Sequence, residues 1–266
     1  MKCLLPISLL ALTPLLAGEL PELSEKPWVG WFSAHESRSF HFGVGGDGRG
    51  SLIPLKSDGE QFTSALWIRI QPIIEEVQSN GRAYSKKVVE ESWEALTEPG
   101  LEAERIAYRA MVEGGAKYEV SFQIDGSEVS CEGRILEAGE LREKPIRLVF
   151  RLQIPDYFRF ERGKDGFEKK FKRDRIELLM ADGKKRKLDI FEEIDAEEIN
   201  ASAIESAQIE YDGFKGPRLE IESGAAGVFE FWNRKMQPLS MGFSLNWMAA
   251  PAGNPDANAG FRLEFK

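Results

Sequence analysis

The stretch Pro145–Ile154, PIRLVFRLQI, decides the fold class. Apolar side chains occupy every second position from Ile146 to Ile154, and three of the four residues between them are Arg147, Arg151 and Gln153. Successive side chains of a β-strand point to opposite faces, so this pattern predicts a strand with one buried side and one wet side. Such alternation is typical of antiparallel sheets.

The same period of two recurs along the chain. It is found in KYEVSFQID at 117–125, in GFSLNW at 242–247 and in FRLEFK at 261–266. Asp-Gly pairs, which tolerate positive φ, separate such runs and predict hairpin turns. They stand at 47–48, 58–59, 125–126, 165–166, 182–183 and 212–213, and an Asn-Gly pair stands at 80–81. Two complete hairpins are predicted, around the pairs at 125–126 and 182–183.

Helix signals are confined to two stretches, and in both the pattern leaves helix and strand open. These stretches are Lys86–Gly100 and Glu192–Ala207. The sequence therefore predicts an all-β fold, a large antiparallel β-sandwich of two packed sheets. We expect roughly a dozen strands and at most one or two short helices.

Residues 1–18 have the composition of a secretory signal peptide. One lysine precedes an uncharged, mostly apolar run from Cys3 to Gly18, which is too short to span a bilayer. We expect this signal, a short leader at 19–27 and one domain at 28–266. The mature protein is expected to be secreted or periplasmic, without stable membrane insertion. The cleavage position stays open, because Leu15 or Leu16 would stand where a small residue is preferred.

The charge balance argues against nucleic-acid binding. The chain of 266 residues has a formal net charge of −9, and its densest basic run, Lys184–Lys187, is followed closely by acidic residues. No basic stripe of the kind that nucleic-acid binders carry is predicted. With Cys3 in the signal, Cys131 is left alone, cannot form an internal disulfide and is predicted to be a small buried side chain. The oligomeric state is left open.

Gly43, Gly45 and Gly48 spell G-x-G-x-x-G, the motif of dinucleotide-binding turns. Such a site needs a helix directly after the motif, whose N-terminus faces the phosphates. Here Arg49-Gly50 and Pro54 follow, among residues typical of strands. The run therefore predicts a hairpin with a flexible tip, and no cofactor is predicted.

Metal-ligating patterns are weak. The two histidines, His35 and His41, would share one face of a continuous strand at ~20 Å from each other, too far apart for one metal ion. Asn254–Gly260 alternates Asn and Asp as a calcium loop does, but it lacks the glycine and the bidentate glutamate of that loop. No metal site is predicted.

Exposed aromatic rings beside polar groups are the remaining signal for a ligand. Rings can stack on the apolar C–H faces of sugars. The segment ALWIRI, at 65–70, places an indole beside a guanidinium on the face opposite its isoleucines, and PWVGWF, at 27–32, holds two further indoles. Polar residues also flank the glycine-rich tip. The candidate ligand-binding residues are Trp31, His41, Asp47, Trp67 and Arg69; catalytic residues are not identified.

Three functions remain open at this point. The favoured hypothesis is an exported β-sandwich that binds a glycan or another extracytoplasmic polymer without catalysis. The first alternative is a carbohydrate-active enzyme that uses a carboxylate or His41 for acid–base chemistry. The second alternative is a structural or assembly protein of the cell envelope. The sequence does not identify the ligand.

Overall fold

The computed structural model describes residues 20–56, 58–61, 67–156, 164–210, 212, 218–224, 227–234, 237–249 and 260–266. The predicted signal peptide and residues 254–259 of the calcium-like segment lie outside these ranges. The signal, the leader and the boundary of the domain therefore stay predictions. Within the described ranges, no helix has the length and apolar character that a membrane crossing requires.

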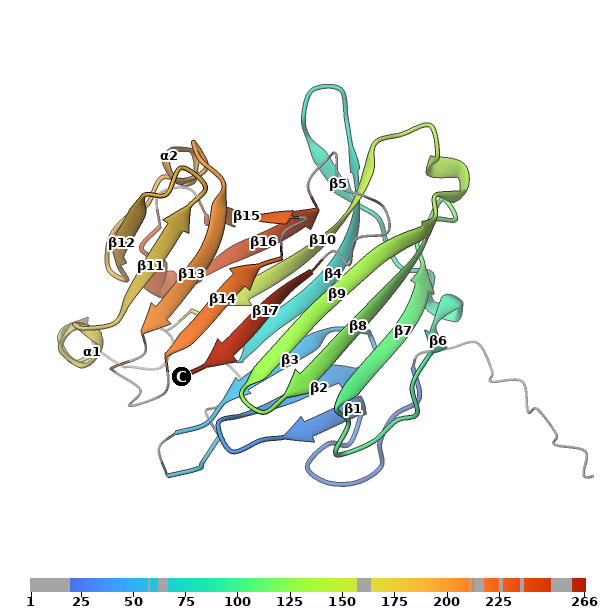
Figure 1. The fold of residues 1–266 in the computed structure, drawn as a ribbon, viewed down its shortest axis with the longest axis horizontal. Helices are drawn as coiled ribbons and strands as arrows, with labels where there is room; N and C mark the ends of the chain where they lie inside the picture. The colour runs from blue at the N-terminus through green and yellow to red at the C-terminus, as the bar shows by residue number, and fades with distance from the viewer. Residues whose placement is uncertain are drawn as a thin grey trace, which may run out of the picture.

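The described residues form an all-β fold with 17 strands, and every strand pair in it is antiparallel (Figure 1). The strands are β1 (Trp31–Glu36), β2 (Phe40–Gly45), β3 (Gly50–Pro54), β4 (Ile68–Val77), β5 (Ala83–Ser85), β6 (Glu94–Ala95), β7 (Arg105–Met111), β8 (Lys117–Asp125), β9 (Glu128–Glu137), β10 (Ile146–Ile154), β11 (Arg175–Met180), β12 (Lys185–Asp189), β13 (Ile204–Glu210), β14 (Leu219–Ser223), β15 (Gly227–Trp232), β16 (Phe243–Ala249) and β17 (Gly260–Phe265).

Two α-helices, α1 (Lys164–Phe171) and α2 (Ala196–Ile199), are short, as expected. The segment Lys86–Gly100 is neither one helix nor one strand: it holds a 3-10 turn at Glu90–Ser92 and the two-residue β6. The segment Glu192–Ala207 is divided between α2 and the start of β13. The Asp-Gly pair at 165–166 lies in α1, so the turn predicted there is wrong.

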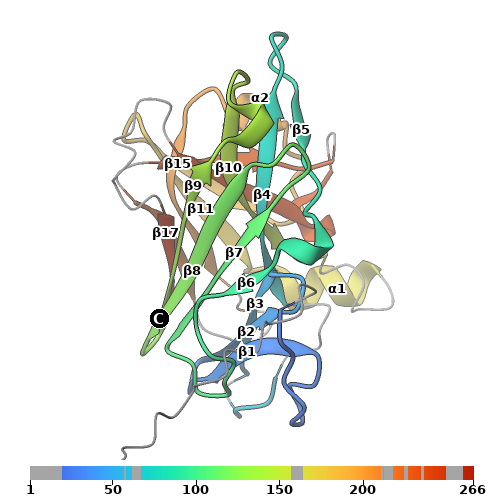
Figure 2. The ribbon, with the colours of Figure 1, turned by 90° about the vertical axis from the view of Figure 1, so that its right-hand side faces the viewer.

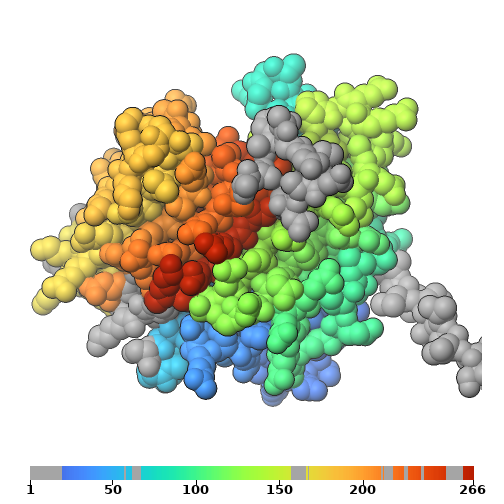
Figure 3. Space-filling model, viewed as in Figure 1, coloured from blue at the N-terminus to red at the C-terminus, as the bar shows by residue number. Residues whose placement is uncertain are grey.

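The strands belong to one strongly curled sheet with two limbs. The first limb has the order β1–β2–β3–β4–β10–β16–β15. The second limb has the order β6–β7–β8–β9–β17–β14. Strand β13 joins the limbs, because it pairs with β14 along four residues and with β15 at Ile204. Figure 3 shows β17, in red, between the orange surface of β14 and the green surface of β9.

The predicted sandwich of two separate sheets is not confirmed, because hydrogen bonding passes from one limb to the other through β13. Alternation in a sequence shows which face of a strand is buried, but it does not show whether two sheets share an edge. The expected number of strands was also too low. Strands such as β5 and β6, with three and two residues, are too short to give a recognisable alternation.

The core lies between the limbs, which pack face to face (Figure 2). The Phe42 ring of β2 lies 5.2 Å from that of Phe122 in β8, and the Phe150 ring of β10 lies 5.5 Å from that of Phe261 in β17. The alternation of PIRLVFRLQI is confirmed here, since Phe150 and Leu152 are fully buried. Cys131 is also fully buried, as predicted.

The two predicted hairpins are confirmed as β8–β9 and β11–β12. The glycine run is likewise a hairpin, β2–β3, with Gly48 at its tip in the left-handed region at φ 72°. The tip is held against the second limb. The hydroxyl of Tyr108 donates to the carbonyl of Gly48 at 2.6 Å, and a Cβ atom at Gly48 would lie 2.7 Å from the ring of Trp93. The glycine is therefore required by packing.

Candidate functional site

Four strands of the first limb bring four side chains into one row. Arg69 of β4 lies opposite Gln153 of β10, Gln153 lies opposite Ser244 of β16, and Ser244 lies opposite Trp232 of β15. Residues directly opposite one another in a sheet share a face. The row therefore crosses the outer face of the first limb, which is the face turned away from the core. Three strand spacings give it a length of ~14 Å.

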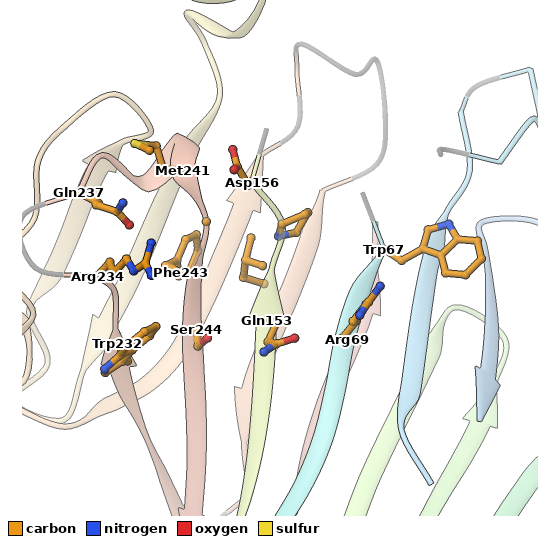
Figure 4. A pocket seen from close by; sticks show the side chains of 13 residues that line it. Trp67, Arg69, Gln153, Asp156, Trp232, Arg234, Gln237, Met241, Phe243 and Ser244 are labelled. Atoms are coloured by element: carbon orange, nitrogen blue, oxygen red, sulfur yellow. The ribbon is translucent and has the colours of Figure 1, made fainter. Parts of the chain in front are cut away.

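The row forms the floor of an open cleft of about 670 Å³. Figure 4 shows Trp232 and Arg234 at one end of the cleft and Trp67 and Arg69 at the other, with Gln153 and Ser244 between them. The residues that line the cleft are Trp67, Arg69, Gln153, Ile154, Pro155, Asp156, Trp232, Arg234, Gln237, Met241, Gly242, Phe243 and Ser244. This volume is within the range of small-molecule sites.

The local sequence of β15 explains the exposed indole of Trp232. In GVFEFW, Phe229 and Phe231 are buried in the core, so Glu230 and Trp232 point to the outer face. Trp232 is 55% exposed. Strand β15 is anchored directly after this residue, because the buried Asn233 side chain donates to the carbonyl of Ile194 at 2.9 Å.

A cluster of aromatic rings supports the other end of the cleft. The rings of Trp31 and Trp67 lie 5.9 Å apart, and those of Trp28 and Trp31 lie 5.3 Å apart in an edge-to-face arrangement. The indole N–H of Trp28 donates to Glu36 at 2.8 Å. In Figure 4 the Trp67 ring points away from the cleft floor. Trp67 lies at this end of the cleft, and the ring of Trp31 packs against it.

The cleft is positively charged although the chain is acidic. Its described lining holds two arginines, Arg69 and Arg234, and one carboxylate, Asp156, for a net charge of +1. The side chains of both arginines make no hydrogen bond or ion pair to any residue that the structure describes. Their guanidinium groups each offer five N–H donors, so they can bind hydroxyl or acidic groups of a ligand.

A second polar row continues the same face. Gln71, Arg151, Asn246 and Glu230 lie opposite one another on β4, β10, β16 and β15, two residues along from the first row. The amide oxygen of Asn246 is buried and has no hydrogen-bond partner among the described groups. The outer face of these four strands is therefore polar over two consecutive rows.

The five candidate residues from the sequence divide among three places. Trp67 and Arg69 line the cleft, and Trp31 lies directly behind Trp67. His41 is on the same face but farther from the cleft, 6.1 Å from Trp28 between ring centres, with a ring nitrogen 2.8 Å from the amide nitrogen of Gln61. Burial lowers the pKa of His41, an effect that Glu36 opposes and His35 reinforces.

Asp47 does not belong to this cleft. It lies at the β2–β3 tip, where its carboxylate accepts from the backbone N–H of Arg49 at 3.1 Å, and it lines a different cavity. The expected position of the two histidines is also wrong. The chain turns between β1 and β2, and His35 pairs with Phe42 while His41 pairs with Glu36, so the two side chains point to opposite faces.

Sequence reasoning missed most of the cleft. The missed residues include Gln153, Asp156, Trp232, Arg234 and Ser244. For Trp232 the signal was present, because the alternation in GVFEFW places this ring opposite two core phenylalanines. For the others, the sequence gives no sign of which strands are neighbours.

The described ranges contain no group of three or more His, Cys, Asp or Glu side chains that could hold a metal ion. Residues 254–259 of the calcium-like segment are outside those ranges.

No family model and no curated protein sequence matches the chain. Among solved structures, the fold is similar to part of an α-N-acetylgalactosaminidase from Bifidobacterium bifidum in complex with GalNAc, with a TM-score of 0.55 and 12% identity over 88% of this chain. The chain covers 35% of that enzyme. A galactose mutarotase related enzyme from Lactobacillus acidophilus aligns over 88% of this chain and 96% of its own, with a TM-score of 0.43 and 10% identity. The first likeness shows a shared fold, and the second is too weak to add to it.

Proposed function

We propose that the protein binds a glycan in the cleft between Trp232 and Trp67. The observation that carries this proposal is the row across four strands, in which an exposed indole ends a line of hydrogen-bonding side chains. A sugar ring presents apolar C–H faces and a rim of hydroxyls, so it needs a flat aromatic surface beside donors and acceptors. Trp232 supplies the surface, and Ser244, Gln153 and Arg69 supply the polar groups.

The fold comparison supports a sugar ligand. The matching enzyme is an α-N-acetylgalactosaminidase whose structure was solved with GalNAc. Because this chain spans about a third of the length of that enzyme, the likeness supports the ligand class and not the enzyme's reaction.

Binding is favoured over glycoside hydrolysis by the acids of the cleft. Hydrolysis in most such enzymes needs two carboxyl groups on either side of the scissile bond. The described part of the lining contributes a single carboxylate, Asp156. His41, the base considered for an enzyme, lies behind the tryptophan cluster and not in the cleft.

A structural role in the envelope would call for a broad apolar surface. Among the described residues, the large exposed hydrophobic side chains are Val29, Tyr84, Leu136, Trp232 and Met241. Trp232 and Met241 belong to the cleft, and the other three lie before β1, on β5 and on β9. This distribution favours a local binding site.

The test is a glycan array with the purified protein, followed by calorimetric titration of the best ligand. We expect Trp232→Ala to raise the Kd at least about tenfold, because a buried stacking contact of an indole is worth more than ~1.4 kcal/mol. The matched control is Tyr84→Ala, which removes an aromatic ring of similar exposure, 52%, outside the cleft. Absence of any glycan ligand, or equal loss of affinity in both variants, would contradict the proposal.

We also propose that the protein acts outside the cytoplasm. The apolar run from Cys3 to Gly18 supports export. N-terminal sequencing of the protein from fractionated cells tests this. A chain that starts near residue 19 in the exported fraction is expected, and an uncleaved chain in the cytoplasm would contradict export.

A further inference from the structure

A second cleft lies at a gap in the first limb. On one edge of β4, β3 pairs with Ile68–Ile70 and β5 pairs with Glu75–Val77, so the residues between them have no strand neighbour on that side. Pro72 lies in this interval. Since proline has no backbone N–H, it fits a strand position without a partner. The gap opens into a cavity of about 580 Å³.

Three parts of the chain surround this cavity. The β2–β3 tip forms one side, the end of β5 with the segment 86–88 forms another, and β7 and β8 of the second limb form the floor. The lining residues that could contact a ligand include Arg49, Lys86, Lys87, Trp93, Tyr118 and Arg151. Gln71 and Arg151 lie one row along from Arg69 and Gln153, so the two clefts are neighbours.

The second cleft is lined by four cationic side chains and by two carboxylates, Asp47 and Glu90. Two further carboxylates contact its cations from outside the lining. Three of the cations face a carboxylate: Arg49 lies 3.4 Å from Asp47, Lys86 contacts Glu76 and Arg151 lies 3.8 Å from Glu75. Lys87 makes no side-chain hydrogen bond or ion pair within the described ranges. An anion in the cleft would therefore meet a cation that is not already neutralised.

The floor carries a hydroxyl that the protein does not use. Tyr118 of β8 is 2% exposed, and its hydroxyl makes no hydrogen bond to a described residue. Its neighbour Tyr108 differs, because the hydroxyl of Tyr108 donates to the carbonyl of Gly48. Burial raises the pKa of Tyr118, so its hydroxyl keeps its proton near neutral pH and can donate. The oxygen of this hydroxyl is not among the fully buried side-chain atoms that lack a partner, so it is accessible from the cleft that Tyr118 lines, and it can donate to a ligand hydroxyl or carboxylate.

An aromatic wall completes the site. Trp93 is half-buried, and its ring lies 5.4 Å from that of Tyr108 in an edge-to-face arrangement. The cleft thus offers cations, a donor hydroxyl on the floor and an indole at its side. These are the groups that a small, negatively charged, hydroxyl-bearing ring requires.

We propose that the second cleft binds a sugar acid of monosaccharide size, with its carboxylate toward Lys87 and a hydroxyl toward Tyr118. This site is separate from the glycan cleft, because it lies at a gap between strands and faces the second limb. Its ligand differs from the ligand of the glycan cleft in carrying a negative charge.

The test is calorimetric titration of the purified protein with sodium glucuronate, glucose and sodium sulfate in parallel. We expect saturable binding of glucuronate. Glucose, which lacks the carboxylate, and sulfate, which lacks the hydroxyl-bearing ring, should each bind at least about tenfold more weakly. Tyr118→Phe and Lys87→Gln should each raise the Kd for glucuronate by about fivefold or more. The matched control is Lys172→Gln, which neutralises another exposed lysine away from both clefts.

Trp232→Ala separates the two proposals, because it should leave glucuronate binding unchanged. The second site is contradicted if glucuronate does not bind, or if sulfate binds as tightly. It is also contradicted if Tyr118→Phe and Lys87→Gln bind glucuronate as the parent does, or if Trp232→Ala abolishes binding. Thermal unfolding of each variant verifies that it is folded. A glycan array that finds no ligand would contradict the proposal for the first cleft, but it would not change the interpretation of the glucuronate titration.

Discussion

Gly43 of β2 lies directly beneath Trp31: a Cβ atom on this glycine would lie 2.6 Å from the Cε3 atom of the indole. The same Cβ atom would lie 2.9 Å from the ring of Trp28. The rings of Trp31 and Trp28 therefore pack directly against the backbone of Gly43, where no side chain separates them from the strand. A side chain of any size at residue 43 must displace rings that support one end of the glycan cleft.

Gly43→Ala is accordingly expected to lower the free energy of unfolding by ~1–3 kcal/mol through overpacking, and to weaken glycan binding through Trp67. Urea unfolding and calorimetric titration measure the two effects. Gly100→Ala is the control, because a Cβ atom at Gly100 meets nothing within 4 Å. Unchanged stability of Gly43→Ala would show that the indoles do not rest on this residue.

The two buried tyrosines should respond differently to loss of the hydroxyl. Tyr108→Phe removes the hydrogen bond to Gly48 that holds the β2–β3 tip, and we expect it to cost ~0.5–1.5 kcal/mol of stability. Tyr118→Phe removes no protein hydrogen bond among the described residues and should be neutral or stabilising. Chemical denaturation measures the free energy of unfolding of both variants. An equal loss of stability would contradict the finding that only the hydroxyl of Tyr108 has a hydrogen-bond partner among the described residues.

The sequence predicts features that depend on residues close together in the chain, and it does not predict contacts between distant segments. Alternation identifies Trp67 and Arg69 as neighbours on one face, because they lie two residues apart in the chain, Trp67 directly before β4 and Arg69 in it. It does not pair Arg69 with Gln153, since that register joins segments far apart in the chain. For the same reason the sequence does not show that Asp47 and Arg69 line different clefts: the turn that holds Asp47 is local, but the strands that it faces, β7 and β8, come much later in the chain.

The stability of the fold should depend on pH through Glu76. This carboxylate is almost fully buried, and hydrogen bonds from Lys86 and Lys144 lower its pKa to about 2. A carboxylate whose pKa falls on folding stabilises the protein above its unfolded pKa of ~4.3, and this contribution is lost as the pH falls toward the folded pKa.

Glu76→Gln should therefore destabilise the protein at pH 7, and the difference from the parent should shrink as the pH falls from about 4.3 toward 2. Urea unfolding across this range tests the prediction. Glu90→Gln is the control, because Glu90 is exposed and lies outside the ion pairs of the described residues. A stability difference that does not vary with pH would contradict the role of the ion pairs.

Cys131 should be chemically silent in the folded protein. It is fully buried, and burial raises the pKa of its thiol well above the ordinary value. Since the thiolate is the reactive form, a maleimide should label Cys131 only after denaturation. Peptide mapping by mass spectrometry separates this residue from Cys3. Rapid labelling under native conditions would contradict its position in the core.

The glycan cleft is tested most directly by the indole N–H resonances of the six tryptophans, each assigned by single substitution. The titrant is the best ligand from the glycan array. We expect the resonance of Trp232 to shift most, that of Trp67 to shift less, and that of the fully buried Trp247 not to move. A bound glycan that leaves Trp232 unchanged, or that shifts Trp93 instead, would contradict this expectation.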